Sequence, residues 1–491
     1  MAGFLRRLAG LMTTTALLMP LAQAQQPATE IAESVEARSF LTPTTVLRSS
    51  ARFHPQIQAA VARVAQAKSR TEGALGAFDT NLSADNRARL TGFWDGRYSD
   101  WQAAKQLRPF GAKVYGGYRL SGGSFPIYED EFFTNEAGEL KLGVLVSLLR
   151  DSSIDARRFA ETDTRLAENQ AQLDALLVRI NVQRRALIAY WRWLTAGRQL
   201  EVYVDLVRIA RDRESGLESK VKEGARAAIE LVENRQNIIR REELVTISER
   251  DFQRAAFDLS LFYRDIDGKP ITPLPNQLPP EQLTENLFSP NTTTVYELPS
   301  VTARPERRAL QTAIERINKD IALRRNNLRP RLDLNVELGR DLGSLAEGGP
   351  SRDGTDTIVS LSLRVPLQRR AARGKLAESK AKLVELNAQL NLLTDQLQAQ
   401  MRGLVLELET TETLLDLMAQ EVEQTRSLQR AEYRRFENGA SDFFLVNLRE
   451  QAAADADIRY HATRMAAAIA QISYDAAIIN LGRLELDGAN F

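Results

Sequence analysis

Proline is missing from two very long stretches of the chain, and this constrains the fold more than any other feature. No proline occurs from Ile127 to Lys269 or from Leu367 to Phe491, whereas eight of the 17 prolines lie between Pro270 and Pro305. Because proline breaks a helix, its absence over such distances permits helices of unusual length. The proline-rich stretch is typical of a loop or linker. The sequence therefore predicts two helical halves joined by a linker.

Apolar residues in both tracts recur every three or four positions. In the second tract they include Leu383, Leu386, Leu390, Leu393 and Leu397. This spacing is typical of the seam of a coiled coil. We expect one long helix of about 65 residues in each tract, roughly 100 Å at 1.5 Å per residue, followed by a return helix. Helices of this length are typical of coiled coils and helical barrels.

A glycine is expected to end each long helix. Gly224 and Gly439 each stand before an alanine, and glycine supplies the left-handed conformation that terminates helices. These glycines are 215 residues apart, whereas Pro55 and Pro305 are 250 apart. The constant order indicates a duplication, and the change in offset indicates about 30 extra residues between Thr80 and Ser147 in the first half.

Before the second long helix, the apolar period switches from helical to two. The stretches Leu332–Leu338 and Val359–Val365 alternate apolar and polar residues around a glycine-rich loop. This pattern predicts an antiparallel hairpin with one apolar face. In the first half, Leu140–Leu148 is the expected return strand, and the outgoing strand is expected within residues 81–120. The sequence thus predicts four strands.

Aromatic residues gather from Phe93 to Phe133, where they are 11 of 41 residues against 7% in the whole chain. Such enrichment is typical of the girdles of membrane β-barrels, although the aromatic core of a small β domain would show it too. Two hairpins cannot close a barrel, and an open sheet edge cannot lie in lipid. If the strands enter a membrane, several copies of the chain must share one barrel.

The N-terminus has the three parts of a secretory signal peptide. Arg6 and Arg7 precede an apolar run from about Leu8 to Leu21, and Ala22-Gln23-Ala24 follows. We expect cleavage after Ala24. Losing both arginines leaves 63 basic against 64 acidic residues, and this balance argues against a nucleic-acid partner. The absence of cysteine excludes disulfides and thiolate metal sites.

No catalytic, cofactor or metal site is predicted. The chain has only two histidines, His54 and His461, far apart in sequence and each within a helical pattern. Neither a phosphate-binding glycine loop nor a nucleophile elbow is present. We interpret His54 as a helix-opening residue and expect a protein that is not an enzyme.

Together these features resemble the TolC-type outer-membrane efflux proteins. The resemblance rests on the duplicated hairpins, on His54-Pro55 and Arg304-Pro305, on Val365–Gln368 before a helix and on Gly439–Phe444 at a turn. It implies a fold that is mainly α with a small β part. Duplicated long α-helical hairpins would form a periplasmic helical barrel. Four β-strands per chain would contribute to a trimeric 12-stranded outer-membrane β-barrel.

The resemblance implies an outer-membrane exit duct of a multi-component efflux pump or type I secretion system. A passive homotrimer, in the outer membrane of a Gram-negative bacterium with a large periplasmic part, would dock to a periplasmic adaptor protein and an inner-membrane transporter. The implied docking residues are Gly224, Ala225, Gly439, Ala440, Ser441, Asp442 and Phe443. The aperture candidates are Glu230, Glu233, Asp442, Leu445 and Leu448, and the two leucines depart from the family's usual acidic positions. The alternative is a periplasmic coiled-coil structural or adaptor protein.

The expected organisation follows the repeat. We expect a signal peptide at 1–24, an N-terminal periplasmic segment at 25–50, a first repeat at 51–263 (strands about 81–148, long hairpin about 152–261), a proline-rich linker at 264–303, a second repeat at 304–484 (strands 331–366, long hairpin about 372–481) and a C-terminal tail at 485–491.

Overall fold

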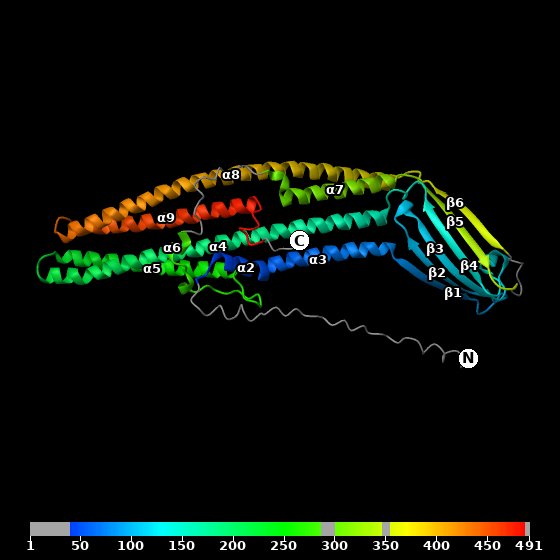
Figure 1. Ribbon diagram of the computed structural model, residues 1–491, viewed down its shortest axis with the longest axis horizontal. Coiled ribbons are helices and arrows are strands. Elements are labelled where there is room, and N and C mark those ends of the chain that lie inside the picture. Colours follow the sequence, from blue (N-terminus) through cyan, green and yellow to red (C-terminus); the bar gives the residue numbers. More distant parts are fainter. Residues whose placement is uncertain (1–39, 286–299, 346–353, 487–491) are drawn as a thin grey trace, which may run out of the picture.

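The computed structural model describes residues 40–285, 300–345 and 354–486. The molecule is a long rod with a β-sheet at one end and two helical turns at the other (Figure 1). The predicted signal peptide, with its cleavage site at Ala24, lies outside the described residues.

Two antiparallel helical hairpins make up most of the rod. The first joins α4 (Ala156–Lys222) to α5 (Ala228–Ser260), and the second joins α8 (Arg370–Glu437) to α9 (Phe443–Ala477). Helices α4 and α8 have 67 and 68 residues, so the predicted long helices are confirmed. None of the helices in the described ranges is apolar over a long enough stretch to span a lipid bilayer.

Two shorter helices connect the middle of the rod to the sheet. They are α3 (Pro55–Leu75), which packs on α4, and α7 (Pro305–Asn326), which packs on α4 and α8. Each has proline in its first turn, where a backbone N–H would have no partner within the helix, so its absence costs no hydrogen bond. The buried His54 caps α3 by accepting a hydrogen bond from the Gln56 amide at 3.2 Å. The interpretation of His54 as a helix-opening residue is therefore confirmed.

The main core lies at mid-length, where α2 (Pro43–Phe53) and the long helices meet. Tyr190, Trp191 and Trp193 of α4 are each at most 1% exposed there. Trp193 stacks on Phe252 of α5 with the ring centres 5.9 Å apart. The linker helix α6 (Glu281–Glu285) lies beside this region (Figure 1).

The sheet is a single antiparallel layer in the order β1-β2-β3-β4-β5-β6. The strands are β1 (Thr80–Ala88), β2 (Arg97–Gln106), β3 (Lys113–Gly122), β4 (Glu139–Ser147), β5 (Arg331–Asp341) and β6 (Thr355–Arg364). The predicted hairpin of the second half, now β5 and β6, is confirmed, as is the fold class of a mainly α protein with a small β part.

The prediction of four strands per chain is wrong, because the sheet has six. The stretch 81–120, expected to hold one outgoing strand, contains β1, β2 and most of β3. In the repeat β1 corresponds to β5 and β4 to β6, so β2 and β3 are the insertion that accounts for the extra residues of the first half. Their alternation is interrupted by Ala103-Ala104 and Gly116-Gly117, which hides the period of two.

Candidate functional site

The chain reverses direction at Gly224 and Gly439, at the end of the rod opposite the sheet (Figure 1). Their φ angles are 72° and 74°. In both turns the glycine N–H donates to the carbonyl three residues earlier over 3.1 Å, and the next alanine N–H donates to the carbonyl five residues earlier over 2.8 Å. A positive φ strains any residue with a Cβ, so both turns favour glycine.

The helices that follow the two turns begin differently. Asp442 accepts a hydrogen bond from the Leu445 amide at 2.8 Å and so caps α9. The equivalent residue before α5 is Ala227, whose side chain has no oxygen to accept such a bond. A side-chain cap stabilises a helix by about 1 kcal/mol. The two turns thus share a backbone but differ in the stability of the helix that each one starts.

The predicted docking residues separate into exposed and buried ones. Ala225, Ala440 and Asp442 are exposed, whereas the Ser441 hydroxyl donates to the Glu432 carboxylate of α8 and is half-buried. Phe443 differs from these residues because its side chain is buried, and its part in docking remains a prediction. Its side chain is 2% exposed, in a cluster with Leu217, Phe436 and Val446. Its neighbour Phe444 is 68% exposed, because consecutive helical residues point about 100° apart.

Four of the predicted aperture residues lie on α5 or α9 near the turns, and the fifth, Asp442, is the N-cap of α9. Glu230 is half-buried and forms an ion pair with Arg226 at 3.6 Å, and Glu233 is exposed. Leu445 is half-buried and Leu448 is 49% exposed. Their role at an aperture remains a prediction.

A buried charge cluster joins the two hairpins near their turns, and we call it the tip clamp. It consists of Arg213 of α4, Arg241 of α5 and Glu450 of α9. Glu450 is 2% exposed, accepts a hydrogen bond from Arg213, and accepts another from Arg241 at 2.9 Å. Arg213 also donates to Asn447 at 3.0 Å, and its guanidinium lies 5.5 Å from the ring centre of Phe443.

Burial lowers the pKa of both arginines of the tip clamp. It lowers the pKa of Arg213 to about 10, with a smaller contribution from the neighbouring Arg241, and it lowers the pKa of Arg241 to about 10. Both side chains remain cationic at neutral pH, so one carboxylate holds two buried cations. Removing that carboxylate would leave both cations buried without a counter-charge, which is strongly destabilising.

Sequence reasoning missed the tip clamp, although a signal for it exists. Arg213 falls between the buried Ala210 and Leu217, at a position that the three-four spacing assigns to the seam. Glu450 likewise lies between the buried Val446 and Ala453. Charged residues at seam positions on several helices indicate a buried ion pair rather than a solvated face.

The sheet at the other end has two chemically different faces. One, the apolar face, carries a row of directly paired valines, Val114, Val144, Val336 and Val359, one on each of β3 to β6. The aliphatic side chains on this face are largely exposed, including Leu82 at 79% and Leu361 at 65%. No second layer packs on it among the described residues.

The opposite side, the polar face, carries charged residues in register. Asp85, Asp100, Arg119, Glu139 and Asp341 are partners in sequence from β1 to β5. Arg119 pairs with Asp100 at 2.7 Å. An exposed apolar face of this extent, opposite a polar one, is typical of a surface that contacts lipid or another protein.

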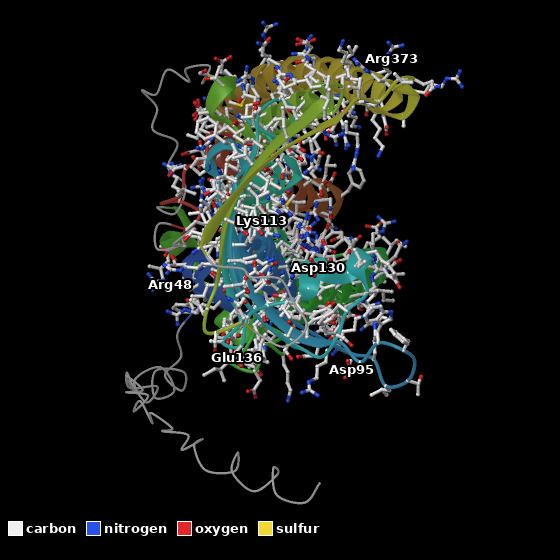
Figure 2. The ribbon with its side chains drawn as sticks, turned by 90° about the vertical axis from the view of Figure 1, so that its right-hand side faces the viewer. Arg48, Asp95, Lys113, Asp130, Glu136 and Arg373 are labelled. Carbon is white, nitrogen blue, oxygen red and sulfur yellow. The ribbon has the colours of Figure 1, made fainter. Side chains whose placement is uncertain are left out.

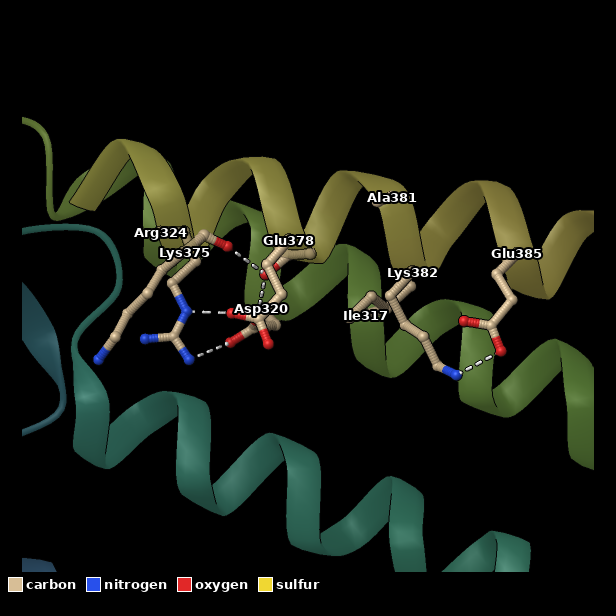
Figure 3. A pocket seen from close by; sticks show the side chains of 9 residues that line it. Ile317, Asp320, Arg324, Lys375, Glu378, Ala381, Lys382 and Glu385 are labelled. Carbon is tan, nitrogen blue, oxygen red and sulfur yellow. Dashed lines mark hydrogen bonds and ion pairs between the residues drawn. The ribbon is translucent and has the colours of Figure 1, made fainter. Parts of the chain in front are cut away.

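A surface pocket lies between α7 and α8, near the sheet (Figure 3). Asp320 forms an ion pair with Arg324 at 3.1 Å, and Lys382 pairs with Glu385 at 2.7 Å. Three acidic and three basic residues line the pocket, so its charges balance and we assign it no ligand. Among the described residues, no group of three histidines or carboxylates is placed to hold a metal ion.

Comparison with known proteins identifies the fold. No family model and no curated protein sequence matches the chain. Solved structures do match along nearly the whole chain. The outer membrane protein VceC from Vibrio cholerae is 14% identical, with a TM-score of 0.61 over 89% of this chain and 95% of its own. The chain has the fold of outer-membrane channels. The TolC-type fold expected from the sequence is therefore confirmed.

Two further channel structures show the same fold. The Campylobacter jejuni CmeC outer membrane channel is 12% identical, with a TM-score of 0.60 over 89% of this chain and 85% of its own. The Neisseria gonorrhoeae MtrE outer membrane channel is also 12% identical, with a TM-score of 0.60 over 89% of this chain and 88% of its own. The likeness thus includes both the helical hairpins and the sheet.

Proposed function

We propose that this protein is a passive outer-membrane channel, the exit duct of a multi-component efflux pump or secretion system. The single observation that carries the proposal is the exposed apolar face of the six-stranded sheet. Each strand has 9 to 11 residues, and a tilted strand needs about 9–11 residues to span a bilayer. The apolar face would contact lipid, and the polar face would line a water-filled pore.

The outer edges of β1 and β6 support assembly from several copies. Among the described residues β1 pairs only with β2 and β6 only with β5, so each has one edge without a partner there. Such an edge is unfavourable in lipid, because its backbone groups have no hydrogen-bond partner there. Pairing of β1 in one copy with β6 in the next would satisfy both edges and close a ring. Three copies would supply 18 strands, from six per chain, instead of the 12 expected from the sequence.

The helical turns are the proposed contact with a periplasmic adaptor protein, which would link the channel to an inner-membrane transporter. They lie at the end of the rod farthest from the sheet (Figure 1). Phe444 is the proposed apolar contact, because it is the exposed member of the pair with Phe443. The alternative of a periplasmic coiled-coil structural protein leaves the apolar face of the sheet without a role.

The assembly is tested by purifying the full chain from outer membranes. We expect extraction to require detergent and the protein in detergent to have the mass of a trimer. A soluble monomer obtained without detergent would disprove the channel.

The docking surface is tested by Phe444→Ser. We expect loss of transport while trimers remain in the outer membrane. Val384→Ser is a matched control, since Val384 is similarly exposed, at 71%, but lies near the sheet end of α8. Normal transport by Phe444→Ser would exclude this side chain from the adaptor contact.

A further inference from the structure

The connection between β3 and β4 folds back over the polar face of the sheet. We call residues 123–138 the exit segment. Figure 2 views the molecule from the end of the rod that carries the sheet, where this segment lies. Phe132 of the segment stacks on Tyr98 of β2 with ring centres 4.7 Å apart. The Arg119 guanidinium lies 5.2 Å from the Phe132 ring centre and donates to the Glu131 carbonyl at 2.7 Å. Tyr98 and Arg119 both project from the polar face, because they pair in register with Arg87 and Asp100 on that side.

Further hydrogen bonds hold the exit segment on this face. The Asn135 amide donates to Asp341 of β5 at 3.0 Å, and the Thr134 amide donates to the Ser121 hydroxyl of β3 at 2.7 Å. Thr134 is completely buried, Asn135 is 1% exposed and Tyr98 is 8% exposed. The segment is therefore a packed part of the sheet's polar side and not a loop that extends away from it.

The apex of the exit segment points away from this packing. Ile127 and Tyr128 are 92% and 79% exposed, and the acidic run Glu129-Asp130-Glu131 follows them directly. Glu129 is tied to Arg89 of the neighbouring connection at 2.5 Å. The apex thus presents exposed apolar and acidic side chains from a base that is fixed by buried contacts.

The proposed barrel is wide enough for the exit segments to lie inside it. With strands about 4.8 Å apart and tilted by about 40°, 18 strands give a backbone diameter of roughly 36 Å, against roughly 24 Å for 12. Barrels of 16 to 18 strands leave an open aqueous channel unless a segment folds into them.

We propose that the exit segments of the assembled copies project into the lumen and constrict the outer mouth of the pore, so that they set the size of solute that passes there. This inference rests on the proposed channel, because only then does the polar face line a pore. The inserted hairpin β2–β3 would increase the diameter of the barrel, and the exit segment that follows it would narrow the outer opening of the pore.

The test uses a reporter cysteine below the constriction, in a chain that has no cysteine of its own. Ser360→Cys places the thiol on the polar face of β6, paired in register with Asn335. Intact cells are treated with a small membrane-impermeant maleimide or with a maleimide that carries a large polyethylene glycol chain. Cells with permeabilised membranes show that the thiol reacts with both reagents.

Two variants open the proposed constriction in the reporter background. Phe132→Ala removes the stack on Tyr98 and the cation contact from Arg119, and a second variant replaces Ile127–Glu131 by two glycines but keeps Phe132. The matched control is Phe93→Ala, which removes a phenylalanine that is 89% exposed in the β1–β2 connection at the same end.

We expect the small reagent to label the reporter in every variant. The large reagent should label it about tenfold faster in Phe132→Ala than in the parent or in Phe93→Ala, because this variant loses both the stack on Tyr98 and the cation contact from Arg119. The two-glycine variant should show at least the same increase. Equal labelling of parent and variants by the large reagent would overturn the constriction but leave the channel standing. Absence of labelling by the small reagent in intact cells would instead overturn the channel itself.

Discussion

Replacing Glu450 by glutamine should loosen the turns of the two hairpins. Glutamine has nearly the same shape as glutamate but carries no charge, so Arg213 and Arg241 would stay buried without a counter-charge. Breaking a buried ion pair by removing one partner costs about 3–5 kcal/mol. Because the glutamine carbonyl can still accept one hydrogen bond, we take the lower end, about 3 kcal/mol.

The opening is local, so the assay must resolve segments of the chain. Hydrogen exchange measured by mass spectrometry reports the free energy of local opening in each peptide. A loss of about 3 kcal/mol corresponds to exchange that is roughly 150-fold faster. We expect this change in the peptides of α4 and α9 that flank Arg213 and Glu450. The peptides around Trp193, in the core at mid-length, should change little.

The matched control is Glu421→Gln, which breaks another contact between arginine and glutamate. Glu421 of α8 pairs with Arg459 of α9 at 2.6 Å, but the two side chains are 36% and 50% exposed. An exposed ion pair contributes at most about 1 kcal/mol. If Glu450→Gln accelerates exchange no more than Glu421→Gln does, the tip clamp does not hold the hairpins together and the reasoning fails.

Three other perturbations test the sheet, one turn and the buried histidine. Leu361→Arg on the apolar face should reduce outer-membrane insertion by roughly 2–4 kcal/mol, whereas Ser362→Arg on the polar face should insert nearly normally; equal insertion of the two in a fractionation assay would show that the faces are misassigned. Gly439→Val should lower the free energy of local opening at the second turn by roughly 1 kcal/mol or more, measured by hydrogen exchange, because its φ of 74° disfavours a β-branched residue. Burial lowers the pKa of His461 from 6.5 to about 4, so the unfolded chain binds a proton more readily and stability is lost as the pH falls through this range. His461→Gln should therefore show a smaller fall in melting temperature across that range, and an unchanged fall would mean that His461 does not govern it.

The helical part of the fold was predictable because its signals are local. Absence of proline sets how far a helix can extend, and a glycine before an alanine marks where it ends. Gly224 and Gly439 are indeed the positive-φ residues of the turns, although neither has a neighbour close enough to exclude a methyl group. The backbone angle alone makes glycine favourable there, and a backbone angle is a property of the local sequence.

The sheet was only partly predictable. The stretches Leu332–Leu338 and Val359–Val365 alternate without interruption, whereas β2 and β3 contain Ala103-Ala104 and Gly116-Gly117. Small residues fit either face of a sheet, so the alternation that separates the faces is lost at these positions. What fixes the inserted strands is pairing with their neighbours, such as Gly116 with Leu142, and pairing cannot be read from one segment alone.

The details near the turns depend on contacts between hairpins. Phe443 is buried in a cluster that includes Leu217, which lies more than 200 residues earlier in the chain. The tip clamp likewise combines three helices from both halves. The sequence indicates that these residues lie near a turn, but the packing of one hairpin on the other decides which side chains remain outside.

The capping difference between the two turns limits the symmetry of any larger assembly. Asp442 caps the helix after the second turn, and Ala227 leaves the first without a side-chain cap. In a closed ring of these chains, turns followed by a capped helix would therefore alternate with turns followed by a helix that has no side-chain cap. Because each chain contains two similar hairpins, the backbone of a ring of n copies has approximate 2n-fold symmetry. The side chains at the turns differ between the two hairpins, so the true symmetry of the ring is n-fold. A circular partner built from identical subunits would have to accommodate two kinds of contact with one surface.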